Sequence, residues 1–427
     1  MKQIKFFLLV ILFLILTPVF ADEIIDENLL FREQDEPVVA TASLENASSV
    51  DNYFEKESTS FTGAFTSKGN YAINRAWLEN SGAFSNNRLN AFSYVNLLLD
   101  IRFKQNYKTF LNLQANSVST TATTSNLNYS IKEMFMDINF NKAVYFRAGK
   151  QVLQWSRTYF WNPSDVINIQ KRDFANMSEY REGVYGLKMH IPLGTAYNYY
   201  AFADFSNARN LDEVGVAGKA EFLVGGSEIG LSAWKKKGFC PVFASDISTK
   251  LAGLDLLGEA AFSYGENTSR VKYVSGIPTI YKISDTWVSK ISLGLSKSFA
   301  WEYADRITLI GELFYNDSGY INNIFADAGL LSTLLANNLY EPNYYAKYYG
   351  AVFLTISKFP LLDMTTNLNL LMNLADNSSI LATGITYSPV NNVVLGMTVY
   401  NYFGPAIGEY TYSGNRMSLE LSSTMSF

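Results

Sequence analysis

The amino-acid sequence predicts an all-β fold, a transmembrane antiparallel up-and-down β-barrel of about 18 strands, with about 16 as the alternative count. Apolar residues make up 48% of the 427 residues, yet the mean hydropathy is +0.00, so apolar and polar side chains are interleaved. The interleaving has a period of two, which is the period of a β-strand. The connections between the expected strands also alternate between short and long, as in barrels that cross a membrane.

Residues 1–21 have the features of a secretory signal peptide. Two lysines precede the apolar run 6–16, and Val19 and Ala21 supply the small residues of a cleavage site. The run is shorter than the roughly 20 apolar residues of a membrane-spanning helix. We therefore expect the mature chain to be exported.

Residues 22–59 differ in composition from the rest of the chain. They contain eleven acidic residues against two basic ones and have no regular apolar pattern. Such a composition favours a flexible segment, which we expect on the periplasmic side. The barrel itself is expected to span 60–427.

The last expected strand, 415–427, shows the alternation most clearly. Apolar residues stand at every second position up to Phe427, with Ser423 as the one interruption, and polar residues fill the positions between them. Because successive side chains of a strand face opposite sides, one face is apolar and the other polar. About 18 such strands are expected near 61–67, 91–103, 106–118, 127–140, 143–151, 182–191, 194–205, 213–224, 226–236, 240–250, 253–265, 286–299, 306–316, 344–358, 362–374, 378–388, 391–402 and 415–427.

The connections sort by parity when they are followed back from the C-terminus. One set is short and rich in Pro, Gly, Asn or Asp, which suits periplasmic turns; it comprises 192–194, 225–226, 252–253, 359–361 and 388–392. The other set includes long segments, which suit extracellular loops; they lie near 68–90, 152–181, 266–285, 317–343 and 403–414.

A soluble β-sandwich would also alternate between an apolar and a polar face. The expected strands, however, run to about 10–13 residues, which is the length of a tilted membrane strand. Their polar face carries Asn, Ser, Gly and Thr, and Tyr and Phe gather near strand ends, as in 197–200 and 400–403. These features favour a barrel with a wet lumen and aromatic girdles.

Two segments carry a resemblance to known proteins. The alternating C-terminal strand that ends on Phe427 resembles the C-terminal signature of bacterial outer-membrane proteins. This resemblance implies that the barrel-assembly machinery reads the strand, with Phe427 as the assembly signal.

The second segment is 143–190. The residues 149–151 (Gly-Lys-Gln) end a strand, Trp155 follows, then 162–165 (Asn-Pro-Ser-Asp), then 181–183 (Arg-Glu-Gly). This order resembles porin-like barrels, although Ser156 stands where Gly is common. The resemblance implies that 152–181, the third connection on the side of the long loops, folds inward and narrows the pore.

The alternation along the strands and this inward loop place charges of both signs in the lumen. The width of a pore and its rings of charge determine which solutes pass. The parity assigns Asp100, Lys188, Lys219, Glu221, Glu259 and Glu312 to the polar face. The expected pore-lining residues are Arg102, Glu133, Asp137, Arg147, Gln151, Trp155, Asp165, Lys171, Arg172, Asp173 and Arg181. The aromatic residues Trp155, Tyr159, Phe160 and Trp161 are expected either to guide sugars or to pack the loop on the wall.

The sequence thus predicts a porin-type channel for passive diffusion of small hydrophilic solutes and no enzyme. The single histidine, His190, lies at the short-turn end of a strand, and we expect a structural role for it. No cofactor or metal is expected, and the net charge of −5 does not favour nucleic acid. Expected partners are outer-membrane lipid, the assembly machinery and small polar solutes, with a homotrimer and a monomer both open. The alternatives are a fatty-acid-uptake-like transporter of hydrophobic solutes and a surface adhesin.

Overall fold

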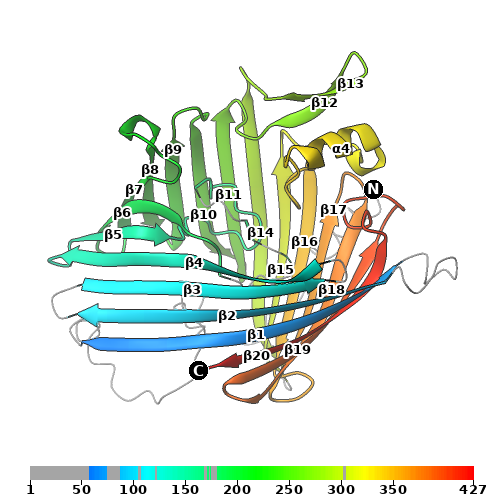
Figure 1. The fold of residues 1–427 in the computed structure, drawn as a ribbon. Coiled ribbons are helices and arrows are strands. Elements are labelled where there is room, and N and C mark those ends of the chain that lie inside the picture. The colour runs from blue at the N-terminus through cyan, green and yellow to red at the C-terminus, as the bar shows by residue number, and fades with distance from the viewer. Residues whose placement is uncertain are drawn as a thin grey trace.

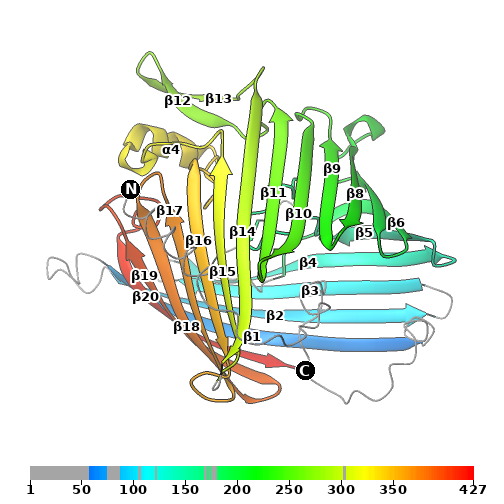
Figure 2. The ribbon, with the colours of Figure 1, turned by 180° about the vertical axis from the view of Figure 1, so that it is seen from behind.

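The computed structural model describes residues 57–74, 87–103, 107–120, 123–167, 171–172, 174, 180–301 and 304–427. Within these residues, an 18-stranded sheet closes on itself, because each barrel strand pairs antiparallel with the next and β1 also pairs with β20 (Figures 1 and 2). The predicted fold class and strand count are confirmed. The predicted signal peptide, residues 22–56 of the acidic segment and Asp173 lie outside the described residues.

The barrel strands follow each other in chain order, separated only by turns and loops. Their bounds are β1 (Ser58–Asn74), β2 (Arg88–Phe103), β3 (Tyr107–Thr120), β4 (Thr123–Phe140), β5 (Val144–Gln151), β6 (Val184–Leu193), β7 (Tyr197–Asp204), β8 (Gly215–Val224), β9 (Ser227–Lys235), β10 (Val242–Leu251), β11 (Leu254–Tyr264), β14 (Trp287–Trp301), β15 (Ala304–Asn316), β16 (Tyr348–Ser357), β17 (Met364–Asn373), β18 (Ser378–Val390), β19 (Val393–Phe403) and β20 (Asn415–Ser426).

Strand β10 shows how the alternating sequence separates the two faces of the wall. Val242, Ala244 and Asp246 are buried toward the barrel interior, whereas Phe243 between them is 52% exposed. Leu421 and Met425 of β20 are likewise about half exposed on the outside, and Ser418 of the other parity is buried. Because successive side chains point to opposite faces, the outer face is apolar and the inner face largely polar.

The two ends of the barrel differ in their connections. At one end the strands are joined by tight turns such as Gly225-Gly226, whose φ angles of 59° and 85° are the positive values that a two-residue hairpin turn of type I′ requires. At the other end most connections are longer, although short ones join β3 to β4 and β17 to β18. The predicted sorting by parity is therefore confirmed, and we refer to the short-turn end and the long-loop end.

Two long loops contain regular structure that the sequence analysis did not predict. The loop after β11 forms a hairpin of β12 (Arg270–Val274) and β13 (Ile277–Tyr281), and the loop after β15 contains the 3-10 helix η4 (Ile324–Ala326) and the helix α4 (Ala328–Ala336). The hairpin and α4 project together beyond the strand tips (Figure 1). Among the described residues, no helix has the length and apolar character needed to cross a membrane.

The seam between the first and last strands is closed by the C-terminal residue. The N–H of Phe427 donates to the carbonyl of Gly63 (2.9 Å), and the N–H of Gly63 donates back to the Phe427 carbonyl (2.8 Å). A β-carbon at Gly63 would lie 2.5 Å from the Phe427 ring. The ring therefore covers the glycine, and a side chain at position 63 would displace it.

Candidate pore constriction

The described residues of the segment 152–181, called here the third loop, lie inside the barrel. Its first part buries Leu153 and Trp155 among inner-face residues of β7 to β11, including Trp234. Further along, Phe160 and Trp161 are fully buried against the inner faces of β15 and β16. The loop therefore lies against the inner wall of the barrel. A loop that narrows the pore must lie in the lumen in this way.

A row of carboxylates on the inner wall receives this loop. Glu221 of β8 stands opposite Gly230, Gly230 opposite Asp246, and Asp246 opposite Glu259. These positions lie near the middle of their strands and share one face. With neighbours of the same face on β9 and β15, they form the acidic row: Glu221, Glu228, Asp246, Glu259 and Glu312.

Two members of the acidic row bind the backbone of the third loop. Glu259, 1% exposed, accepts hydrogen bonds from the backbone N–H of Thr158 (2.7 Å) and from the N–H (3.2 Å) and hydroxyl (2.6 Å) of Ser164. Glu312, fully buried, accepts from the N–H groups of Phe160 (2.9 Å) and Trp161 (2.7 Å). The loop thus satisfies two buried carboxylates and obtains acceptors for its own donors.

Arg157 of the third loop contacts the rest of the row. Its guanidinium pairs with Asp246 (2.6 Å), Glu221 (3.2 Å) and Glu228. Burial lowers the pKa of Arg157, but the charges of these three carboxylates outweigh that effect, and the pKa is raised. Lys219 of the wall also pairs with Glu221 and Asp246, at 3.0 Å each. Charges of both signs therefore meet where the loop touches the wall.

A second sector of the wall, on β2 to β6, carries charges of both signs. Arg102 stands opposite Lys108, Lys108 opposite Asp137, Asp137 opposite Arg147, and Arg147 opposite Lys188. These five residues, of which Lys108 was not among the predicted lumen residues, therefore lie side by side around the inner wall.

The guanidinium of Arg147 is fixed in this sector. It forms a two-pronged ion pair with Asp137, at 2.7 and 3.1 Å, and lies 3.8 Å from the centroid of the Phe135 ring. Arg102 pairs with Asp100 at 3.5 Å. Paired and stacked arginines of this kind are held in one geometry.

Three further predicted residues lie at the start of the third loop or in the strands beside it. Gln151, fully buried, donates to the backbone carbonyls of Arg147 and Gly186, and Glu133 accepts from the backbone N–H of Val152 (2.8 Å). Trp155 is 8% exposed, so it packs the loop on the wall.

Within the loop itself, Asp165 is the centre of contacts. Arg181 pairs with its carboxylate (3.0 Å), and Lys171 donates to its backbone carbonyl (2.7 Å). Arg172 donates to the Tyr159 carbonyl, and burial, together with the charge of Arg181, lowers the pKa of Arg172. Asp165, Lys171, Arg172 and Arg181 are therefore brought together.

Asp246 and Glu228 were missed by the sequence analysis. Both stand at inner-face parity, Asp246 between Ala244 and Ser248. Apolar residues stand on both faces of these strands, such as Leu231 and Trp234 of β9 and Val242 and Phe243 of β10, so the pattern there gives a weaker signal than in β20. Counting alternate positions from the neighbouring turn, Gly225-Gly226, could have assigned Glu228 to the inner face.

Solved structures of bacterial outer-membrane porins resemble this chain in fold. Pseudomonas aeruginosa OccK8 (OprE) matches with a TM-score of 0.53 and 9% identity, over 86% of this chain and 98% of that chain. Pseudomonas putida OprB matches with a TM-score of 0.49 and 9% identity, over 86% and 94%. Salmonella typhi OmpF matches with a TM-score of 0.44 and 9% identity, over 86% and 97%. Identities this low show the barrel fold alone. The sequence matches no protein-family model and no curated protein.

Proposed function

We propose that this protein is an outer-membrane channel for passive diffusion of small hydrophilic solutes, with the third loop as its constriction. The observation that carries the proposal is the attachment of the loop to lumen-facing carboxylates near the middle of the strands, by Glu259, Glu312 and Arg157. A loop held there narrows the lumen and sets charge at the narrowest level, which is how channels select solutes.

The apolar outer face and the closed sheet support a place in the outer membrane, since a closed barrel leaves no unpaired strand edge in lipid. Export would use the predicted signal peptide, residues 1–21. Assembly would use the C-terminal strand, whose Phe427 closes the seam onto Gly63. The long-loop end would then face outward and the short-turn end the periplasm.

A purely passive role also agrees with the place of the single histidine. The ring of His190 stacks on Tyr200 at 4.4 Å between centroids, and its Nε2 lies 3.0 Å from the Asn198 side-chain oxygen. Stacking and hydrogen bonding account for the residue as part of the wall of β6 and β7. We infer that it does no catalysis.

Liposome swelling tests the solute class. The refolded mature chain in liposomes is expected to admit small sugars, at a rate that falls steeply as the sugar grows. A heat-modifiable, folded barrel that admits no sugar but transfers long-chain fatty acids would replace the proposal by hydrophobic-solute transport.

A further inference from the structure

We propose that the pocket between the third loop and the wall at β9 to β11 binds a small zwitterion with an apolar side chain, namely an amino acid or a dipeptide. The proposal adds a solute class to the proposed channel function. It rests on that function in one respect, namely that a solute bound in this pocket lies next to the proposed constriction. It is argued from the charges, rings and unpartnered groups that line the pocket.

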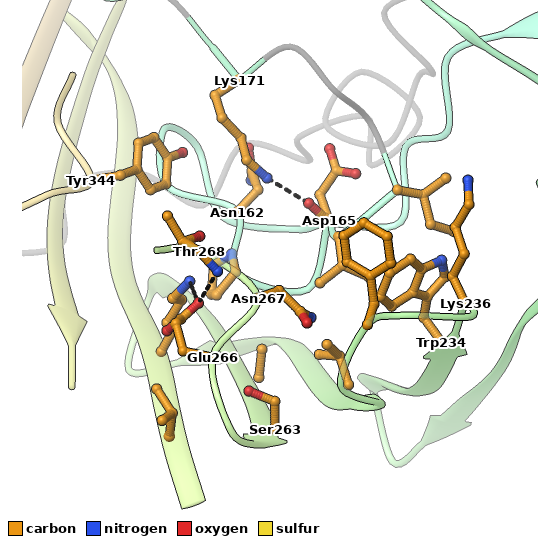
Figure 3. Close-up of a pocket in the computed structure, with 18 of the residues that line it drawn as sticks. Asn162, Asp165, Lys171, Trp234, Lys236, Ser263, Glu266, Asn267, Thr268 and Tyr344 are labelled. Carbon is orange, nitrogen blue, oxygen red and sulfur yellow. Dashed lines mark hydrogen bonds and ion pairs between the residues drawn. The ribbon is translucent and has the colours of Figure 1, made fainter. Parts of the chain in front are cut away.

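The pocket has a volume of ≈ 320 Å³. Ligand pockets span roughly 300–1,000 Å³, so this one suits a solute of amino-acid or dipeptide size. Figure 3 shows Tyr344 and Lys171 on one side, Trp234 and Lys236 on the other, and Asn267 between them. The third loop supplies one wall, so an occupant would touch the proposed constriction directly.

Most charged groups of the pocket neutralise one another. Asp165 pairs with Arg181 (3.0 Å), Asp204 with Lys236 (2.8 Å), and the buried Glu266 with Lys290 (3.1 Å). The two charges of each pair cancel. These pairs therefore give the pocket no net charge that would attract a strongly charged solute.

Lys171 and Glu341 are the two lining charges that form no ion pair within the described part of the chain. Both adjoin Tyr344: the Lys171 ammonium lies 5.9 Å from its ring centroid, and Glu341 is the largest of the charges that raise the pKa of the Tyr344 hydroxyl, after burial. One cation and one anion beside a single ring match a solute that carries a carboxylate and an ammonium group.

The other side of the pocket carries apolar side chains next to the Lys236–Asp204 ion pair. Trp234, Phe239, Val242 and Ile167 line it, and these side chains favour an apolar group of the solute. The indole Nε1–H of Trp234 is buried and has no acceptor among the described residues. An unmade buried hydrogen bond is costly, and the carbonyl of a peptide bond would satisfy it, so a dipeptide should bind more tightly than a single amino acid.

Titration calorimetry on the refolded full chain in detergent tests the proposal, with leucyl-leucine as probe. We expect leucyl-leucine to bind, and its N-acetyl and C-amide derivatives to bind about tenfold or more weakly, because each loses a charged hydrogen bond.

Lys171→Met should abolish discrimination against the C-amide, and Glu341→Gln should abolish discrimination against the N-acetyl form. Trp234→Phe should remove the advantage of leucyl-leucine over leucine. Lys272→Met, on the β12–β13 hairpin outside the pocket lining, is the matched control.

Equal binding of the blocked and free peptides, or no binding by a folded barrel, would overturn the proposal. Binding of glucose with the affinity of leucyl-leucine would overturn the solute class. Single-channel conductance in salt, measured on the same preparations, separates the two proposals. A barrel that conducts but binds no peptide refutes the pocket alone, and one that binds but does not conduct refutes the channel.

Discussion

Glu259 and Glu312 are the residues on which the position of the third loop depends. Both are buried to 1% or less, where an unsatisfied carboxylate would be costly. Their partners are backbone N–H and hydroxyl groups of the loop and of Ser292. Each carboxylate thus needs the loop in place, and the loop needs the carboxylates.

Glu259→Ala is expected to loosen the third loop. It removes the acceptor of the Thr158 and Ser164 N–H groups, and each donor left unsatisfied in a buried site costs about 1–3 kcal/mol. We expect a higher and noisier single-channel current with the barrel intact on a heat-modifiability gel. The control is Asp212→Ala, an exposed carboxylate that pairs with Lys237. A quiet current of unchanged size in Glu259→Ala would argue against the anchoring role.

Arg157→Gln should shift the ion selectivity toward cations. The substitution removes one positive charge from among Asp246, Glu221 and Glu228. The reversal potential in a salt gradient measures the effect, which should shrink at high ionic strength because of screening. An unchanged reversal potential would mean that this cluster lies outside the ion path.

For single residues, the sequence predicts which face of the barrel wall a side chain lies on better than it predicts which residues the side chain contacts. Alternation placed Glu221, Glu259 and Glu312 on the polar face, but pairing with loop residues about 100 positions away has no local signal. The question left open for the loop aromatics is answered by burial, since Phe160 and Trp161 are 0% exposed and therefore pack the loop on the wall.

The outer loops are joined by a buried carboxylate. Glu409, in the loop after β19, accepts from the Tyr340 hydroxyl (3.0 Å), the Asn343 N–H (2.9 Å) and the Asn373 amide (2.9 Å). Its own N–H donates to Asp376 (2.7 Å). Burial raises the pKa of Glu409 to about 7, and the charge of Asp376 also raises it, whereas the hydrogen bonds lower it.

This raised pKa predicts that the loops loosen as pH rises. A carboxyl whose pKa is higher in the folded state binds a proton more tightly there, so its contribution is complete below its ordinary pKa and is lost as pH rises through about 7. Hydrogen exchange in 404–414, corrected for intrinsic rates, should be about tenfold faster at about pH 8.5 than at about pH 5. Glu409→Gln should remove this pH dependence, and a variant that kept it would assign the effect to another group.

Closure of β20 onto β1 should depend on the space over Gly63. Gly63→Leu places a side chain where the Phe427 ring lies, 2.5 Å from the added β-carbon. We expect this variant and a chain lacking Phe427 to give a smaller folded fraction on refolding, scored by heat-modifiability. Leu362→Ala, an exposed site (78%) at a short turn, is the control, and equal folding of all three would refute a role for the seam.

Strands were easier to predict than loop structure. Eighteen segments of period two correspond to the 18 barrel strands, because each strand carries its own in-and-out signal. The β12–β13 hairpin and α4 were missed because both are short. They are stabilised by contacts between loops, such as the Tyr273 hydroxyl on Asp327 (2.7 Å), which also caps α4.

At the scale of the whole molecule, a closed barrel holds the third loop against its inner wall. The sheet leaves no open edge, since β1 pairs with both β2 and β20. The acidic row and Arg157 lie where the loop contacts the wall, and a second sector with charges of both signs lies on β2 to β6. This distribution predicts an open aqueous path with weak selectivity between ions, since charges of both signs line it.

Single-channel recording of the refolded mature chain in a planar bilayer tests this account most directly. We predict stable current steps, with conductance of the order of a nanosiemens in concentrated salt, as expected of a water-filled barrel. A barrel that is folded by heat-modifiability but passes no current would contradict the account and would identify the third loop as a plug.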